Sequence, residues 1–247
     1  MDTPRNTTLD LLHAHRSIRR FTDEEIPQAA VDAAVAAGQQ ASTSSAVQAY
    51  CMIRVRDAER RRRLADVSGP QEKVALSPAL FVVCGDVRRH RLAAERAGGE
   101  YHAHLEAFLL AVIDASLFAQ NFVVALESLG YGVCYIGGLR NDLPAVDEIL
   151  QLPDGVYPLY GLCAGRPDES PMPRPRLPVR AVCFDEHYPD DEAMLASMDD
   201  YDAAYVAYLA QRGATPRGWS AVMAHQFSTP GRDDIGAYYR SKGADLT

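Results

Sequence analysis

Hydrophobic residues along the chain recur with two periods, one typical of helices and one typical of strands. The longest helical pattern runs from Glu100 to Leu129, with apolar residues at every third or fourth position. Gly130 follows it, and glycine often ends helices because it adopts the left-handed conformation there. Apolar residues occupy more than one face of this stretch, so we expect a central helix that is buried on several sides.

Shorter patterns predict the elements that surround this helix. Their order along the chain favours an α+β or α/β domain with a sheet of four or five strands. No strand is followed by the glycine pattern of a Rossmann fold, and the P-loop pattern is also absent. Helices are expected at Asn6–Ala14, Gln28–Gln40, Glu59–Val67 and Asp191–Gln211, and strands at Ala49–Val55, Ala79–Val83, Gly132–Ile136 and Tyr157–Ala164.

The C-terminal part of the chain differs in composition from the rest. Residues 165–178 contain five prolines and cannot continue a helix or the centre of a sheet. Residues 213–247 are rich in Gly, Pro and Arg and show weak periodicity. We therefore expect one domain over residues 1–212, and an arm over residues 213–247 that wraps onto this body or onto a partner subunit.

Composition and charge exclude several classes of protein. A net charge of −8 argues against nucleic-acid binding, which leaves a basic footprint. Five cysteines without a CxxC pair, and an N-terminus without an apolar signal core, favour a cytoplasmic protein with reduced thiols. The longest apolar runs, such as Phe108–Ile113, are much shorter than the ~20 residues of a membrane span. No metal site is expected, because His102 and His104 do not share a helix face.

Four clusters of polar residues are candidates for chemistry. His15–Arg20 offers guanidinium groups and a hydroxyl, which suit a phosphate. The run Ser42–Ser45 with Gln48 offers donors and acceptors for a polar heterocycle, and Gly137–Gly138 lets backbone approach a flat ligand. Prolines around Arg174 and Arg176 hold two arginines on an extended backbone. Taken alone, each cluster is more typical of a surface turn or linker.

Taken together and in this order, the clusters resemble the nitroreductase superfamily, and most closely its oxygen-insensitive NADPH nitroreductases and NADPH–FMN oxidoreductases. The resemblance covers the chain from about residue 9 to its end. It rests on His15–Arg19 with Phe21–Thr22, Ser42–Ser45 with Gln48, Gly69–Gln71, Tyr135–Asn141, Tyr160–Pro167, Pro173–Pro178 and Arg212–Gly213.

The resemblance implies an α+β homodimer with a mixed sheet of four to five strands, the long helix in the dimer core and an arm that embraces the partner. It implies one FMN per subunit at the interface and NADPH or NADH as the electron donor. Arg212 and Arg217 would bind the NADPH 2′-phosphate. The residues that would hold FMN are His15, Arg16, Ser17, Arg19, Ser42, Thr43, Ser44, Gln48, Gln71, Tyr135, Ile136, Gly137, Gly138, Arg174 and Arg176.

The expected function is therefore a two-electron, ping-pong reduction of nitroaromatics, quinones or free flavin, with the chemistry at flavin N5 and no catalytic side chain. An alternative is a flavin-binding protein of a dehalogenation or flavin-fragmentation branch of the superfamily, or a flavin carrier without NADPH turnover. A third is an interaction module that uses the tyrosines of Asp191–Gln211, although tyrosines at this spacing are more typical of a core or a dimer contact.

Overall fold

The structure is a computed structural model that describes residues 4–247. The chain divides into two compact units. Unit 1 comprises the residues up to Pro171 together with Arg232–Thr247, and unit 2 comprises Met172–Gly231. The expected boundary, between a domain over 1–212 and an arm over 213–247, differs from the boundaries of these two units, and the expected division stays a prediction. Residues 1–3 of the expected domain lie outside the described residues.

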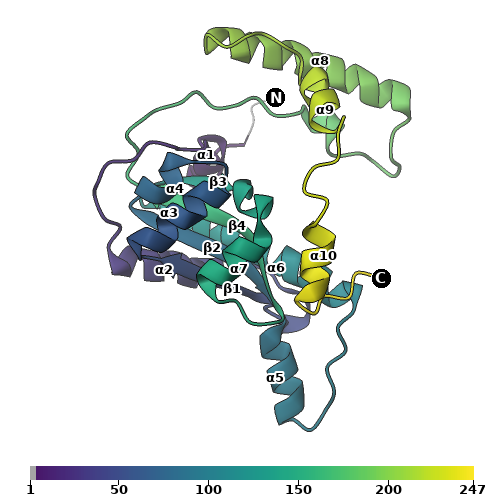
Figure 1. Cartoon of the computed structure of the whole chain (residues 1–247). Helices are drawn as coiled ribbons and strands as arrows, with labels where there is room; N and C mark the ends of the chain where they lie inside the picture. The colour runs from purple at the N-terminus through teal and green to yellow at the C-terminus, as the bar shows by residue number, and fades with distance from the viewer. Residues whose placement is uncertain (1–3) are drawn as a thin grey trace. The chain divides into compact units, whose positions relative to one another are not determined.

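Unit 1 is built on a four-stranded sheet (Figure 1). Every neighbouring pair of strands is antiparallel, so the expected mixed sheet is wrong. In residues 4–247, parallel pairing is confined to one isolated bridge between Ser17 and Val133, which does not continue into a ladder of paired residues. The strands are β1 (Tyr50–Val55), β2 (Ala79–Asp86), β3 (Gly132–Ile136) and β4 (Val156–Gly165), in the spatial order β1-β2-β4-β3.

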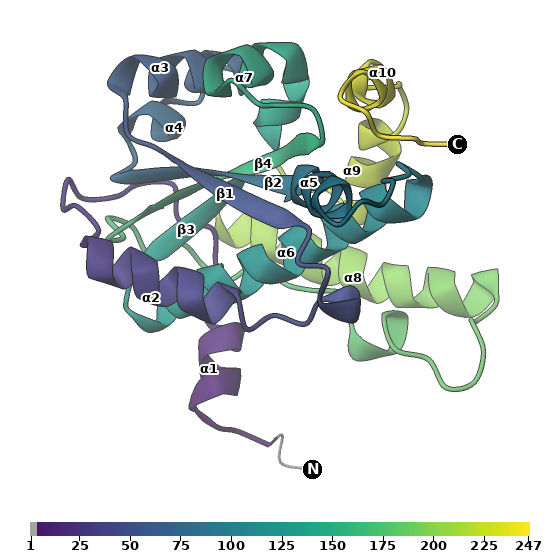
Figure 2. The ribbon, with the colours of Figure 1, turned by 90° about the horizontal axis from the view of Figure 1, so that it is seen from below.

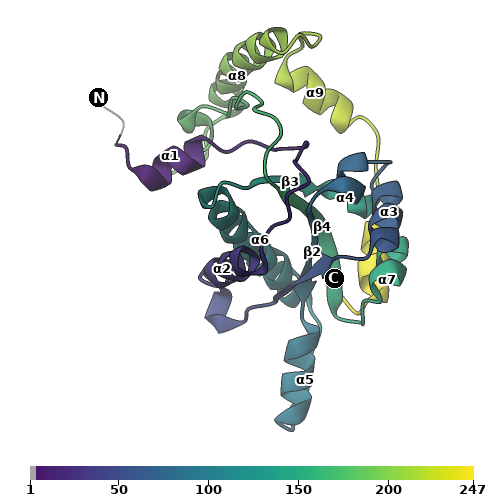
Figure 3. The ribbon, with the colours of Figure 1, turned by 90° about the vertical axis from the view of Figure 1, so that its left-hand side faces the viewer.

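Helices cover both faces of this sheet (Figures 2 and 3). Because successive strand residues point to opposite faces, β2 contributes Phe81 and Val83 to one core and Leu80 and Val82 to the other. The first core lies against α2 (Gln28–Gly38) and α6 (Leu105–Ser128), and the second against α3 (Ala58–Val67), α4 (Glu72–Leu76) and α7 (Leu143–Leu150).

The long helix α6 begins at Leu105, five residues after its expected start, because the His104 side chain accepts a hydrogen bond from the Ala107 backbone and caps it there. Eight of its residues are buried, which confirms a central helix. By length and composition α6 could cross a membrane, with a mean hydropathy of 1.9, and it is the one such helix in the described residues. A core helix packed on a sheet meets the same criterion, and 44% of that apolar window is buried inside the protein.

The end of the chain packs onto its own unit through α10 (Ile235–Ser241). Tyr239 donates a hydrogen bond of 2.8 Å to the Pro158 carbonyl of β4. The buried Lys242 Nζ lies 2.9 Å from an Asp147 carboxylate oxygen and donates to the Leu152 carbonyl. Residues 232–247 of the expected arm therefore pack onto the body of the same chain, and the expected contact of the arm with a partner subunit stays a prediction.

The core of unit 2 is aromatic. Its helices are α8 (Asp191–Gln211), which has the expected bounds, and α9 (Trp219–Gln226), which the weak periodicity did not predict. Between them lie the tyrosines of α8, with Tyr201 and Trp219 in edge contact at 5.6 Å between ring centroids. These tyrosines thus form a core, as their spacing indicated. The remaining helices of the described chain are α1 (Thr7–His13) and α5 (Arg88–Arg96) in unit 1.

Candidate functional site

The first candidate segment, His15–Arg19, runs along the outer edge of β3. Ile18 donates a backbone hydrogen bond of 2.8 Å to the Val133 carbonyl, and its side chain is buried. Gly132 makes room for that side chain, since a Cβ on Gly132 would lie 2.5 Å from Ile18 Cγ1. This anchor fixes the polar residues on either side of Ile18 against one end of the sheet.

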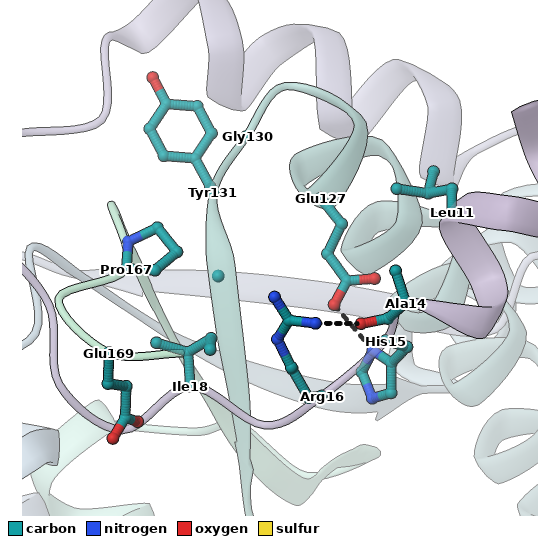
Figure 4. Close-up of a pocket in the computed structure, with 11 residues that line it drawn as sticks. Leu11, Ala14, His15, Arg16, Ile18, Glu127, Gly130, Tyr131, Pro167 and Glu169 are labelled. Atoms are coloured by element: carbon teal, nitrogen blue, oxygen red, sulfur yellow. Dashed lines mark hydrogen bonds and ion pairs between the residues drawn. The ribbon is translucent and has the colours of Figure 1, made fainter. Parts of the chain in front are cut away.

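A cavity of about 200 Å³ lies at the start of this segment (Figure 4). His15 Nδ1 lies 2.7 Å from a Glu127 carboxylate oxygen, which ties the segment to the last turn of α6. Arg16 donates to the Ala14 carbonyl at 3.4 Å. Two of the expected FMN residues therefore share a cavity with two acidic residues that the sequence did not single out, Glu127 and Glu169.

The turn after Ile18 binds a carboxylate of its own chain. Glu169 accepts hydrogen bonds from the backbone N–H groups of Arg19, at 2.5 Å, and Arg20, at 3.2 Å. Burial by itself raises the pKa of Glu169, but the two backbone donors and the arginine charges outweigh it and hold the pKa below its usual value. The donor set of this turn therefore suits an anion.

Further expected residues lie at the C-terminal end of β3, whereas the segment His15–Arg19 contacts the start of this strand. Tyr135 and Ile136 end the strand, and the short helix η2 (Gly137–Asn141) begins directly after them. A Cβ on Gly138 would lie 2.4 Å from the Ser68 carbonyl oxygen and 2.6 Å from Gln71 Nε2. Gly138 is thus required for close packing against the segment that carries Gln71.

Positive charge lies beside this group. Lys73 Nζ is 2.5 Å from the Gln71 amide oxygen. Arg19 and Lys73 line a second cavity, of about 270 Å³, together with the acidic Asp23, Glu72 and Asp168. Lys73 was missed from the sequence because nothing in its local pattern distinguishes it from a surface lysine.

The loop Ser42–Gln48 lies at the other edge of the sheet, directly before β1. No hydrogen bond within residues 4–247 joins it to the segment His15–Arg19 or to the end of β3. Ser45, Ala46 and Gln48 all have a positive φ, which costs non-glycine residues of order 1–3 kcal/mol each. The loop contains the short helix η1 (Ser44–Ala46). His90 Nε2 lies 2.6 Å from the Val47 carbonyl oxygen, and this hydrogen bond holds the loop in place. Strain of this kind clusters at ligand-binding sites.

The expected arginines after residue 171 lie in unit 2, and two of them act on one phenol. Arg212 donates to the Tyr208 hydroxyl at 3.1 Å and lies over its ring. Arg174 adds a positive charge near this hydroxyl. Burial raises the pKa of Tyr208, but the hydrogen bond from Arg212 and the charges of the two arginines outweigh that and lower it. Arg176 follows Pro175, whose carbonyl accepts from the Tyr201 hydroxyl at 2.9 Å. Arg217 directly precedes α9.

Asp114 of α6 has a structural role. It is buried, and its Oδ2 accepts a 3.0 Å hydrogen bond from the Ala49 backbone N–H, which joins α6 to the residue directly before β1. Its Oδ1 is buried without a hydrogen-bond partner among the described residues.

Comparison with known proteins agrees with this fold. The nitroreductase family matches residues 12–166, and the C-terminal domain of the nitroreductase family matches residues 174–247. The chain belongs to the nitroreductase family. Within it, the chain falls with the NADPH–FMN oxidoreductase group that its motifs resemble, at about 38% identity over the full length.

Individual relatives of the chain are reductases. The "FMN reductase (NADPH)" of Bacillus subtilis is 39% identical over 244 residues, which cover 96% of this chain and 98% of that protein. The "Oxygen-insensitive NADPH nitroreductase" of Salmonella typhimurium is 39% identical over 238 residues, covering 96% and 97%. The solved structure of the NfrA1 nitroreductase from B. subtilis superposes with a TM-score of 0.93 at 38% identity, covering 98% of this chain and all of that one.

Proposed function

We propose that this chain is an FMN-dependent oxidoreductase that takes hydride from NADPH and passes two electrons to nitroaromatics, quinones or free flavin. The names of its relatives support this reaction class. The observation that carries the proposal is the arrangement of the candidate residues along β3. The segment His15–Arg19 contacts the start of the strand at Val133, and the strand leads into Tyr135–Gly138, which packs against Gln71. Lys73, next to Gln71, lines a cavity together with Arg19.

These residues fit FMN by their chemistry. The Arg19 guanidinium group suits the FMN phosphate, because charge-assisted hydrogen bonds hold phosphate oxygens. The backbone donors of its turn already hold the Glu169 carboxylate. The Gln71 amide and the open backbone at Gly137 suit the polar edge and the flat face of the isoalloxazine. His15, Arg16 and Ser17 complete the set on this side. When bound, FMN supplies the hydride-accepting atom, while the protein supplies position and electrostatics.

We assign the NADPH 2′-phosphate to Arg212 and Arg217 of unit 2, which provide the charge that it requires. Arg174 and Arg176, on the proline-stiffened segment, keep their expected role as ligands of the FMN phosphate. Tyr208 positions Arg212, because its hydroxyl accepts a 3.1 Å hydrogen bond from that guanidinium group.

The proposal includes a homodimer. The loop with Ser42, Thr43, Ser44 and Gln48 lies across the sheet from the end of β3, so a second copy must bring it to the flavin. An exposed apolar row on α6 offers a surface for that copy, since its side chains recur every four residues and are 39–51% exposed. The row consists of Leu105, Leu109, Ile113 and Leu117.

An absorption spectrum of the purified protein, followed by anaerobic addition of NADPH, tests the function. We expect flavin bands that bleach on addition. The matched variants Arg19→Ala and Arg20→Ala test the site, because both side chains line the same cavity and that of Arg20 is already paired with Glu169. Loss of a charge-assisted contact of about 1.5–3 kcal/mol weakens FMN binding about 10- to 100-fold in Arg19→Ala and far less in Arg20→Ala.

The outcomes separate the alternatives. Flavin bands that bleach with neither NADPH nor NADH would place the chain in a non-reductase branch. A colourless protein that fails to take up added FMN would refute the proposal. Equal FMN affinities of the two arginine variants would remove Arg19 from the phosphate site.

A further inference from the structure

Four of the five cysteines stand opposite one another in the sheet. In the antiparallel ladder of β1 and β2, the register pairs Cys51 with Cys84. In the ladder of β3 and β4, it pairs Cys134 with Cys163. Directly opposed residues of antiparallel strands point to the same face, so each pair brings two thiols together. The spacing of cysteines along the chain contains no sign of this.

The spacing of the first pair suits a disulfide. The Asp86 backbone N–H donates to the Ala49 carbonyl at 2.9 Å, which marks this as a hydrogen-bonded pair. Hydrogen-bonded and non-hydrogen-bonded pairs alternate, so Cys51 and Cys84, two residues further in, again form a hydrogen-bonded pair with Cα atoms about 5.5 Å apart. Disulfides span about 4.4–6.8 Å between Cα atoms.

The two pairs differ in access to solvent. Cys51 lies on the edge strand β1 and is half-buried, whereas Cys84, Cys134 and Cys163 are buried. A hydrogen bond with the Cys84 thiol lowers the pKa of Cys51, whereas burial raises the pKa of Cys134 and raises that of Cys163 to about 12. Thiols that respond to oxidants are low in pKa, accessible and next to a second cysteine. Of the four cysteines in the sheet, Cys51 combines these three properties, whereas the hydrogen bond with Cys51 and burial raise the pKa of Cys84, its neighbour.

We propose that Cys51 and Cys84 form a reversible redox site that hydrogen peroxide oxidises to an intramolecular disulfide. The Cys51 thiolate attacks the peroxide O–O bond, forms a sulfenic acid and releases the other oxygen as water after protonation. The Cys84 sulfur then attacks the Cys51 sulfur, forms the S–S bond and expels the sulfenic oxygen as a second water. Two thiols lose two electrons in total, and one hydrogen peroxide gains them.

The site is built for reversal. Opposed Cβ atoms in a sheet are about 4.5–5.5 Å apart, whereas a disulfide requires about 3.5–4.5 Å. The bond therefore draws β1 towards β2 and stores strain, and strained disulfides are the readily reducible ones. Cys51 lies three residues after Gln48, so oxidation acts next to the strained loop that the proposed function assigns to the flavin.

The test is mass spectrometry of the full chain, treated with hydrogen peroxide and then with a dithiol. Cys183 is exposed, so the experiment uses the Cys183→Ser variant to prevent links between molecules. We expect a loss of two hydrogen masses, a peptide that links Cys51 to Cys84 after non-reducing digestion, and full recovery with the dithiol. Adding Cys51→Ala abolishes the loss, whereas adding Cys134→Ala, the matched change in the buried pair, leaves it intact.

A second variant tests the first step, the oxidation of Cys51 to a sulfenic acid. With Cys84→Ala, the sulfenic acid of Cys51 has no thiol opposite it and is trapped by a sulfenic-acid reagent. Three results would overturn the proposal. In the first, Cys51 gains oxygen but forms no linked peptide although Cys84 is present. In the second, the linked peptide contains Cys134 or Cys163 instead, and in the third, Cys51 and Cys84 stay reduced at peroxide levels that oxidise free glutathione. None of these results depends on the flavin chemistry, so the proposed function stands or fails separately.

Discussion

Replacing Gly138 by alanine separates two roles of the Gly-Gly turn after β3. The added Cβ would lie 2.4 Å from the Ser68 carbonyl oxygen, whereas ordinary contact begins at 3.4 Å. Backbone must therefore move by about 1 Å, and overpacking of this kind costs about 1–3 kcal/mol. Because the obstacle is backbone and the second neighbour is the Gln71 amide at 2.6 Å, we expect the upper end, about 3 kcal/mol.

The adjacent glycine is the matched control. A Cβ on Gly137 would lie 3.3 Å from Arg140 Nη2, the flexible end of a side chain that can shift. At about 2–4 °C per kcal/mol for a chain of this size, Gly138→Ala lowers the melting temperature of the flavin-free protein by about 6–12 °C, and Gly137→Ala lowers it far less. Thermal unfolding and urea titration of both variants measure the difference.

The FMN affinity of the same variants tests the proposed contact. If backbone at Gly137 faces the flavin, Gly137→Ala weakens FMN binding while the flavin-free protein keeps its stability. Equal stability of the two variants would refute the packing argument. Unchanged FMN affinity in Gly137→Ala would remove this residue from the flavin site.

Three other predictions concern named contacts. Glu169→Gln destabilises the protein at neutral pH. The pKa of Glu169 is lower in the folded state, so the stability that this carboxylate contributes is present above its unfolded pKa and disappears as the pH falls through the folded pKa. Urea titrations in which the variant stays less stable than the parent protein in acid would contradict this prediction. Arg212→Ala raises the KM for NADPH much more than that for NADH, and equal increases in steady-state assays would argue against 2′-phosphate recognition. Tyr208→Phe reproduces part of this selective effect, about two- to tenfold, because Arg212 loses a 3.1 Å hydrogen bond while the ring remains; a KM unchanged for both donors would show that the phenol positions nothing.

Local chemistry determined much of this protein before any tertiary contact was known. The strand Gly132–Ile136 and the helix Asp191–Gln211 have the predicted bounds, because apolar periodicity and flanking Gly and Asp residues mark their ends. Short helices such as α4 and α10 were missed, because five to seven residues carry too little periodicity and their stability comes from packing on unit 1. The motif order was sufficient to predict the family.

Only the tertiary structure decided which residues meet. Nothing local pairs His15 with Glu127, or Glu169 with the backbone of Arg19, because these contacts span more than a hundred residues of chain. The antiparallel sheet and the opposition of Cys51 and Cys84 depend on strand register, which long-range pairing sets. The sequence by itself therefore determined the family and the chemistry of the candidate residues. The fold determined which of them share a site and which thiols form a pair.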